Sequence, residues 1–448
     1  MIAHLARFWL TFESPVNRAA YLKHGFALAL LKYGGDALLV GTGTGAFWSP
    51  FDYMQSVPFL LDETFANAPG YLAPALAVWT MPFLWIGVTM SMRRALDAGW
   101  SAWAALLFFV PYANYGLMLT LAALPTSGRT SGLRVAPRPQ EARLPSALLA
   151  IGAGSATGLG ILILSVRLLN SYGLALFLGA PFVIGTVTGF LLCRRYPASL
   201  RETHEAVTMT MLLIGGVAFL LGTEGAVCLL MMLPLGIVLA LMGGAMGRAI
   251  ARLGTGTASH AAIVVLMLPS AAAWEAGTET VVLREVQSAI EIDATTEVVW
   301  NHVIAFSPLP EPTELLFRLG VAYPMRAEIE GKGVGAMRYC VFSTGRFVEP
   351  ITRWEPGRRL SFDVIESPPP MKEWSFYEGV APPHLEGYLV PRRGEFRLVA
   401  LPNGRTRLEG STWYEQRLRP EGYWVLFSDA IIRRIHLRVL EHIALLAE

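Results

Sequence analysis

The residue whose side chain is best suited to take part in a reaction is Glu349, which lies in an otherwise apolar stretch. In a β-strand, side chains two apart point the same way, so Phe347, Glu349, Ile351 and Arg353 share one face. A carboxylate between apolar side chains can act as a general base, because burial disfavours its charged form and raises its pKa. The alternative, which we favour, is an ion pair with Arg338 or Arg353 that stabilises the sheet.

Histidines supply the other candidates. His384 lies in the long, proline-containing stretch 367–388, which suits either a lid over a ligand site or a simple cover for a sheet edge. His436 and His442 occur among arginines near the C-terminus and are six residues apart. That spacing does not form a helical metal pair, so we expect them on a solvated basic face.

Cysteine usage points to neither metal nor disulfide chemistry. The three cysteines, Cys193, Cys228 and Cys340, show no CxxC pattern or other metal-ligand spacing. Neither GxSxG nor a P-loop occurs, which leaves a serine hydrolase or a nucleotide-binding protein without support. We therefore expect no metal site, no cofactor and no disulfide framework.

Alternating patterns place Glu349 within a series of strands bounded by Gly and Pro turns. The expected strands cover 281–292, 322–330, 336–342, 347–354, 359–365, 394–401 and 405–415. Two helices are expected, over 297–305 and 311–319, and Pro420-Glu421 begins a third that runs to about Ala447. The apolar stripe of this last helix is Trp424, Phe427, Ile431, Ile435, Val439, Ile443 and Leu446.

This order of elements resembles the SRPBCC superfamily, which includes START, Bet v 1 and polyketide cyclase/dehydrase-like proteins. The resemblance covers 283–446 and rests on Ile290-Glu291-Ile292-Asp293-Ala294, Val298-Val299-Trp300, Gly335, Arg338, Gly345, Glu349 and Gly404-Arg405-Thr406-Arg407-Leu408. It implies a helix-grip fold, in which a curved antiparallel sheet grips the terminal helix around an apolar cavity. Members bind lipids, sterols or polyketides, and a few catalyse aromatisation or dehydration. The superfamily has no universal catalytic motif, so no active site is transferred.

We predict that a hydrophobic ligand would be contacted by side chains of the sheet and the terminal helix. The predicted contacts are Tyr339, Phe347, Glu349, Ile351, Tyr388, Tyr414, Trp424, Phe427 and Ile431. Aromatic residues at these places would serve core packing equally well.

The rest of the chain has the composition of a membrane protein. Among 448 residues, 53% are hydrophobic and 16% are charged, whereas about 25% charge is usual in soluble proteins. Apolar runs of about the length that crosses a bilayer occur at 24–45, 71–92, 103–125, 145–166, 173–193, 206–222, 225–247 and 258–275. We expect seven or eight spans. The net charge of +2 gives no basic field for nucleic acid.

The first 125 residues resemble the bacterial DUF805 membrane family. The matching phrases are the lead-in Phe12–Tyr21, the loop Arg94–Trp103 and Val110-Pro111, with Ala95 and Ala98 departing from the pattern. Four regions result, namely a DUF805-like region over 1–125, a polar linker over 126–144, further membrane helices over 145–276 and a soluble helix-grip domain over 281–448. The family carries no known chemistry to transfer.

Charges within and between the apolar runs bear on topology. Lys32 and Asp36 lie one helical turn apart and are expected to pair inside the bundle, although a role in transport is the alternative. If 103–125 turns back instead of crossing, nearly all arginine-rich segments fall on the cytoplasmic side. The chain would then lie in a bacterial inner membrane with its soluble domain outside the cytoplasm.

Three functions remain open on these grounds. The first choice is a membrane-anchored domain that binds a hydrophobic small molecule or lipid. The second is a cyclase or dehydratase-like enzyme that uses Glu349 or His384. The third is a non-catalytic domain on a membrane anchor that recognises a partner protein.

Overall fold

The computed structural model describes residues 5, 8–10, 12, 15–54, 68–69, 71–109, 113–126, 142–168, 172–252, 283–375 and 382–448. The chain divides into two compact units. The membrane-helix unit comprises Met1–Ile214 and Leu233–Thr280, and the helix-grip unit comprises Gly215–Met232 and Val281–Glu448. The second unit therefore includes a short piece from within the apolar half of the chain.

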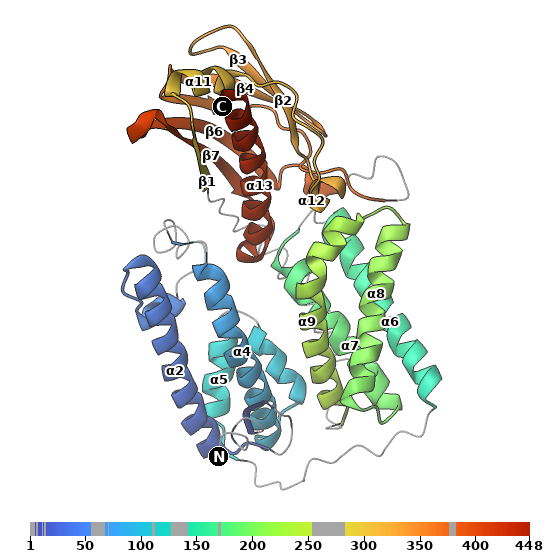
Figure 1. The fold of residues 1–448 in the computed structure, drawn as a ribbon. Coiled ribbons are helices and arrows are strands. Elements are labelled where there is room, and N and C mark those ends of the chain that lie inside the picture. Colours follow the sequence, from blue (N-terminus) through green and yellow to red (C-terminus); the bar gives the residue numbers. More distant parts are fainter. Residues whose placement is uncertain are drawn as a thin grey trace. The chain divides into compact units, whose positions relative to one another are not determined.

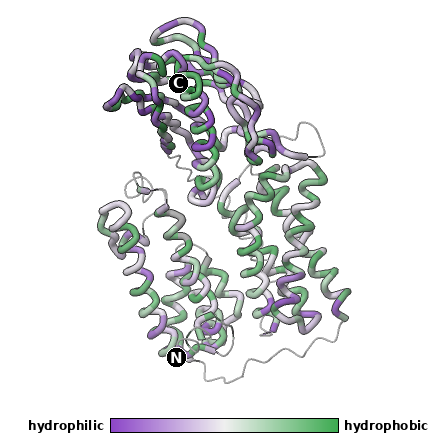
Figure 2. The backbone as a smooth tube through the Cα atoms, in the orientation of Figure 1, coloured by the Kyte–Doolittle hydropathy of each residue, from purple (hydrophilic) through white to green (hydrophobic). Residues whose placement is uncertain are grey.

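The described part of the membrane half is helical throughout (Figures 1 and 2). Its long helices are α2 (Arg18–Thr44), α4 (Leu72–Asp97), α6 (Arg143–Ile163), α7 (Ala180–Arg195), α8 (Leu200–Leu220) and α9 (Ala226–Arg252). Shorter elements are η1 (Pro50–Met54), η2 (Ala102–Phe109), α5 (Ala113–Ala123), η3 (Leu164–Leu168) and η4 (Ala175–Gly179). Figure 2 shows that these helices are mainly hydrophobic.

Four described segments are long and apolar enough to cross a membrane, namely Arg143–Val166, Ala175–Arg195, Leu200–Leu220 and Ala226–Arg252. The run 103–125 is not one helix: η2 ends at Phe109 and α5 begins at Ala113. At 1.5 Å per residue, the 11 residues of α5 extend about 17 Å, which is too short for a ~30 Å hydrocarbon core. The run 258–275 lies outside the described residues.

Small residues bring two of these helices into backbone contact. A Cβ atom at Gly185 of α7 would lie 1.9 Å from the Ala240 carbonyl oxygen of α9, and one at Gly243 would lie 2.0 Å from that of Phe182. Only glycine fits at such a crossing. Gly185 and Gly243 therefore permit the close packing of α7 and α9.

The charged pair within α2 is also present. Lys32 forms an ion pair with Asp36, whose side chain is buried and also accepts a hydrogen bond from Tyr53. These contacts agree with the structural interpretation of the pair, in which it stabilises the bundle.

The helix-grip unit is built on a seven-stranded antiparallel sheet of order β1-β7-β6-β5-β4-β3-β2. The strands are β1 (Leu283–Ile292), β2 (Pro324–Glu330), β3 (Met337–Phe342), β4 (Gly345–Glu355), β5 (Arg359–Asp363), β6 (Leu389–Ala400) and β7 (Thr406–Gln416). The helices are α11 (Thr296–Ile304), α12 (Leu315–Arg318) and α13 (Glu421–Ala447). Strand order and terminal helix confirm the predicted helix-grip fold.

Helix α13 packs on the β1–β7 side of the sheet. Val439, Leu440 and Ile443 are buried against Ile292 of β1 and Leu408 of β7, and closer to the start of the helix Ile432 packs on Val286 and Tyr414. The predicted stripe is right at Trp424, Val439 and Ile443. Around its middle it is shifted, because Ile431 and Ile435 face a second apolar cluster that includes Phe317, Met371 and Leu385.

A β-bulge corrects the predicted face of β4. The pairing of β4 with β5 shifts between Ile351 and Arg353, and one extra residue reverses the alternation beyond it. Arg353 therefore lies on the exposed side near Glu355, whereas Trp354 packs against the core. Period two holds for Phe347, Glu349 and Ile351 and fails at Arg353.

Candidate functional site

The central polar feature of the sheet interior is an ion pair between Arg338 and Glu349. The two residues are directly opposite each other on β3 and β4, so the register places their side chains on the same face. Both are buried, and Arg338 donates a hydrogen bond to Glu349. The ion pair predicted for Glu349 is present, with Arg338 as its partner.

Aromatic rings surround this pair. The guanidinium carbon of Arg338 lies 4.9 Å from the ring centre of Phe362, 5.6 Å from Phe396 and 5.8 Å from Phe306, within the range of cation–π attraction. Burial raises the pKa of Glu349, and the positive charge of Arg338 opposes that rise. The Arg338 Nε atom is buried without a hydrogen-bond acceptor among the described residues.

Next to the ion pair, the same face carries aromatic side chains that are only partly buried. Cys340 lies opposite Phe347, and the rings of Phe347 and Phe342 are 4.6 Å apart. Both phenylalanines pack against the core and retain partial exposure, whereas Ile351 is 2% exposed. This end of the inner face combines apolar surface with a buried guanidinium, the composition of a ligand site.

The other predicted ligand contacts have varied positions. Tyr339 alternates with Arg338 and Cys340, so it lies on the opposite face, where Arg346 stacks over its ring at 5.1 Å. Tyr388 is half-buried, and its carbonyl accepts a hydrogen bond from the Arg417 amide. Neither residue is therefore grouped with Glu349 on the inner face of β3 and β4.

At the start of α13, predicted contacts are partly used in packing. Tyr414 is fully buried and donates a hydrogen bond to Asp429 at 2.5 Å, and the Trp424 indole donates to the Arg419 carbonyl at 3.2 Å. Phe427 and Ile431 are half-buried. Phe427 contacts Tyr423 edge to face, with ring centres 5.4 Å apart.

The expectation that His436 and His442 lie on a solvated face is wrong. His442 is 9% exposed and lies 3.1 Å from the Ser307 carbonyl. His436 faces the sheet, 2.7 Å from the Thr412 hydroxyl and 3.3 Å from that of Ser288. Burial lowers the pKa of His436 to about 4, with a smaller contribution from Arg433. His436 faces the sheet and His442 faces the segment that follows α11, whereas the neighbouring Arg433 and Arg434 face solvent.

His384 belongs to a cluster that sequence reasoning missed, within the helix-grip unit. Its Nε2 atom is 2.9 Å from the thiol of Cys228, in the first turn of α9, and its Nδ1 atom is 3.6 Å from Glu224. The Glu373 carboxylate completes a group whose donor atoms all lie within 4.8 Å of one another. Cysteine, histidine and carboxylate side chains are the ligands that zinc takes in proteins.

Two of these groups have shifted proton affinities. Burial raises the pKa of Glu373, although the Cys228 thiol and the Val227 and Cys228 amides favour its charged form. Burial lowers the pKa of His384 to about 4. A buried carboxylate and a neutral imidazole are thus adjacent.

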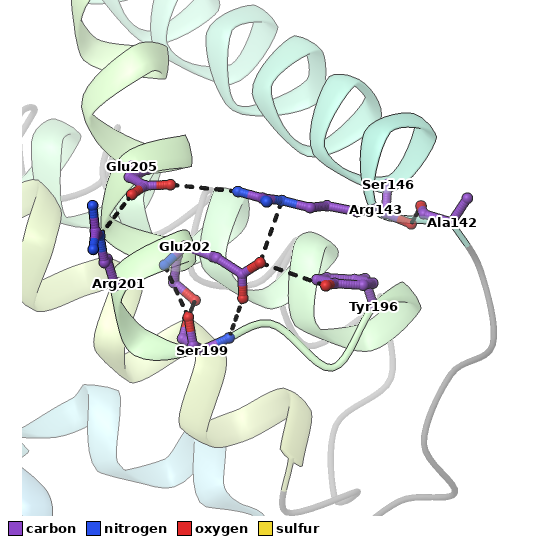
Figure 3. A network of polar contacts seen from close by, with 9 residues as sticks. Ala142, Arg143, Ser146, Tyr196, Ser199, Arg201, Glu202 and Glu205 are labelled. Atoms are coloured by element: carbon purple, nitrogen blue, oxygen red, sulfur yellow. Dashed lines mark hydrogen bonds and ion pairs between the residues drawn. The ribbon is translucent and has the colours of Figure 1, made fainter.

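A different polar site lies at one end of the membrane-helix unit (Figure 3). An open pocket of about 890 Å³ is lined by apolar residues such as Ile151 and Leu192. At its rim, Arg143 of α6 pairs with Glu202 and Glu205 of α8, at 3.3 and 3.5 Å. Because these charges pair with one another, they hold the start of α6 against the start of α8.

Comparison with protein families identifies the N-terminal part. Residues 9–132 match the family described as "Protein of unknown function (DUF805)". This part of the chain is similar to that family. Among curated proteins, none matches the chain.

The charged last turn of α4, in the part that is similar to DUF805, has a structural role. Arg94 is fully buried, pairs with Asp97 and donates to the Leu121 carbonyl at 3.0 Å. It also donates to the Leu124 carbonyl, beyond the end of α5. A cation at a helix C-terminus satisfies its last carbonyls, so this arginine fixes α5 against α4.

Solved structures with a similar arrangement cover the C-terminal part. A structural-genomics protein from Nitrosospira multiformis is 18% identical and covers 36% of this chain and 94% of its own, with a TM-score of 0.25. A further example is the Zhui aromatase/cyclase of a Streptomyces species, which is 15% identical and covers 37% of this chain and 93% of its own, with a TM-score of 0.24. Another is truncated norcoclaurine synthase from Thalictrum flavum, which is 15% identical and covers 37% of this chain and 94% of its own, with a TM-score of 0.24. At these values no ligand or reaction is transferred, and the helix-grip assignment rests on this chain's own strand order.

Proposed function

We propose that this protein is a membrane-anchored helix-grip protein that binds a hydrophobic small molecule or lipid. The observation that carries the proposal is the Arg338 guanidinium, whose buried Nε donor has no acceptor among the described residues. Buried polar atoms in folded proteins are nearly always hydrogen-bonded. A ligand with a hydrogen-bond-accepting or anionic end, such as a fatty acid carboxylate, would satisfy this donor.

Side chains beside Arg338 suit the apolar body of such a ligand. Phe342 and Phe347 are partly exposed on the inner face of β3 and β4, whereas α13 packs on the β1–β7 side of the sheet. Covering apolar surface contributes roughly 25 cal/mol per Å². A long-chain ligand would gain binding energy from these rings and orientation from Arg338.

The enzyme alternative receives less support from Glu349. A general base must be free to take a proton, and Glu349 is held in an ion pair within a ring of phenylalanines. Its role in this proposal is to keep the guanidinium in place. We therefore assign Glu349 to stabilising the pair.

Photo-crosslinking tests the binding proposal. A fatty acid carrying a diazirine, added to the full chain in nanodiscs, is expected to label peptides of β3 and β4. Phe347→Trp, which fills the space beside Arg338, is expected to reduce that labelling about tenfold. Tyr339→Trp is the matched control, because Tyr339 lies on the opposite face. Labelling confined to membrane helices, or unchanged by Phe347→Trp, would contradict the proposal.

We further propose that the helix-grip domain lies outside the cytoplasm of a bacterial inner membrane. The supporting residues gather where α6 and α8 begin and α7 and α9 end, namely Arg143, Arg194, Arg195, Arg201, Arg248 and Arg252. The opposite ends of these helices carry one arginine, Arg167. The connection 221–225 between α8 and α9 is also at these ends, and it belongs to the helix-grip unit. Arginine-rich ends stay in the cytoplasm.

Reporter fusions test this orientation. A C-terminal fusion to a phosphatase that is active only outside the cytoplasm is expected to be active. A fusion to a fluorescent protein that matures only in the cytoplasm is expected to be dark. A bright fluorescent fusion with an inactive phosphatase would reverse the orientation.

A further inference from the structure

The cluster of Cys228, Glu373 and His384 is assembled from distant parts of the sequence within the helix-grip unit. Cys228 is in the first turn of α9, and the other two residues come from the segment between β5 and β6. The Ala226 amide donates to the Trp374 carbonyl at 3.1 Å, which aligns the two segments. Three different donor types, a thiol, a carboxylate and an imidazole, converge at this contact.

Glu373 is a buried carboxylate beside the Val227 and Cys228 amides at the start of α9. It is 6% exposed, and neither of its oxygens accepts a hydrogen bond of good geometry within the described part of the chain. A Cβ atom at Gly225 would lie 1.8 Å from one of these oxygens, so the carboxylate is pressed against the start of α9. Burying a carboxylate without a cationic partner is costly, and a nearby cation would reduce that cost.

His384 is oriented as histidine ligands are. Its Nε2 atom faces the Cys228 thiol, and its Nδ1 atom is 3.6 Å from the Glu224 carboxylate. In metal sites, the ring nitrogen that does not bind the metal usually faces a carboxylate or carbonyl, which fixes the tautomer. Glu224 is therefore placed to hold Nε2 as the metal-binding atom.

We propose that Cys228, Glu373 and His384 form a site for a divalent cation of the zinc class, with Glu224 as the partner of the ligating histidine. A soft thiolate, an imidazole and a carboxylate together favour Zn²⁺ over Mg²⁺ or Ca²⁺, which prefer oxygen ligands. On binding, the metal takes the sulfur of Cys228 and the thiol proton is released to solvent. The proposal goes beyond ligand binding in the sheet interior and does not depend on it.

The geometry needs only a small adjustment. Zinc bound about 2.3 Å from sulfur and about 2.0 Å from nitrogen holds these two atoms about 3.5 Å apart in a tetrahedron. The thiol and Nε2 are now 2.9 Å apart, so a modest separation admits the ion. Three protein ligands leave a fourth position for water or another ligand.

The same residues also have the order of a cysteine nucleophile, a histidine base and an orienting carboxylate. Glu373 argues against that use, because a buried negative charge beside the thiol opposes formation of the thiolate. A cation favours the thiolate and neutralises Glu373 together. The two assignments differ in metal binding, which the experiment measures.

Cobalt spectroscopy of the full chain in detergent tests the site. After removal of metal, titration with Co²⁺ is expected to give about one equivalent of binding with a thiolate-to-cobalt charge-transfer band, reversed by Zn²⁺. Cys228→Ser should abolish the band, and Glu224→Gln should weaken binding about 10–100-fold. Cys193→Ser and His302→Gln are matched controls, because neither residue is in the cluster, and they should behave as the wild type.

A second measurement needs no variant and covers the case in which Cys228→Ser does not fold. Alkylation of Cys228, followed by mass spectrometry, should be slowed by Zn²⁺ in the wild-type chain. Absence of a charge-transfer band in the wild type, a band that survives Cys228→Ser, or equal alkylation with and without Zn²⁺ would each overturn the proposal.

Discussion

Glu349 and Glu373 are both buried in the helix-grip unit, yet they are accommodated in different ways. Glu349 has its partner on the next strand, where the register of β3 and β4 sets Arg338 directly opposite. Glu373 has no such arginine among the described residues; its neighbour Cys228 comes from the start of α9, and His384 comes from a later part of its own segment between β5 and β6. Burial raises the pKa of each carboxyl.

The difference separates a structural charge from a candidate functional one. Removing one partner of a buried ion pair in a sheet strongly lowers stability, because the remaining charge is then isolated. A buried carboxylate without a cationic partner reduces stability, and binding of a cation restores it. Stability measurements on the two residues should therefore change in opposite directions.

The largest effect is expected at the Arg338–Glu349 pair. Arg338→Met or Glu349→Gln leaves one buried partner alone and should cost about 3–5 kcal/mol of unfolding free energy. Arg338→Met combined with Glu349→Leu should recover most of that loss, since no charge remains buried. Hydrogen exchange of β3 and β4 amides in the full chain measures both the loss and the recovery.

The exposed pair of Arg353 and Glu355 is the control for that series, and Arg353→Met should cost no more than about 1 kcal/mol. Equal losses at Arg338 and Arg353 would remove the distinction between a buried and an exposed pair. Full stability of Glu349→Gln, with lipid uptake intact, would contradict the structural role of Glu349.

His436 extends the comparison to a buried group that carries positive charge when protonated. Its pKa is lowered to about 4, so between pH 6.5 and 4 the unfolded chain binds more protons than the folded one. Stability from this group is therefore present above pH 6.5 and decreases on acidification, by at most roughly 3 kcal/mol at pH 4.

Between pH 6.5 and 4, the variant His436→Gln should lose less stability than the wild type does. Hydrogen exchange of the β1 and β7 amides measures this loss. His302→Gln is the control and should keep the wild-type profile. An unchanged profile in His436→Gln would show that His436 is not the titrating group.

The smallest effect, and the one that reverses the sign, is expected at Glu373. With a chelator present, Glu373→Gln removes a buried carboxylate that has no cationic partner, and it should leave stability unchanged or raise it by about 1 kcal/mol. With Zn²⁺ at 100 times its Kd, the wild type should gain about 2.7 kcal/mol, and the variant should gain less. Thermal unfolding in both conditions checks this. A large loss in chelator would place Glu373 with Glu349 as a structural group.

Local patterns account for the parts of the fold that the sequence determined. Alternation and turn residues placed the strands of the helix-grip unit, and helical periodicity placed α13, because each pattern records contacts between residues that are near in the chain. The partner of Glu349 could be predicted for the same reason, since β3 and β4 form a hairpin with a short turn. Apolar runs likewise marked the four membrane-length segments.

What only the tertiary structure decided is the set of contacts between distant segments. The bulge at Ile351 turned Arg353 outward, and the pitch of α13 against the sheet took His436 and His442 out of solvent. Cys228 was part of an apolar run, Glu373 and His384 part of an irregular segment, and no spacing relates them. Their convergence depends on how the start of α9 packs on the segment between β5 and β6, and such packing leaves no period in the sequence.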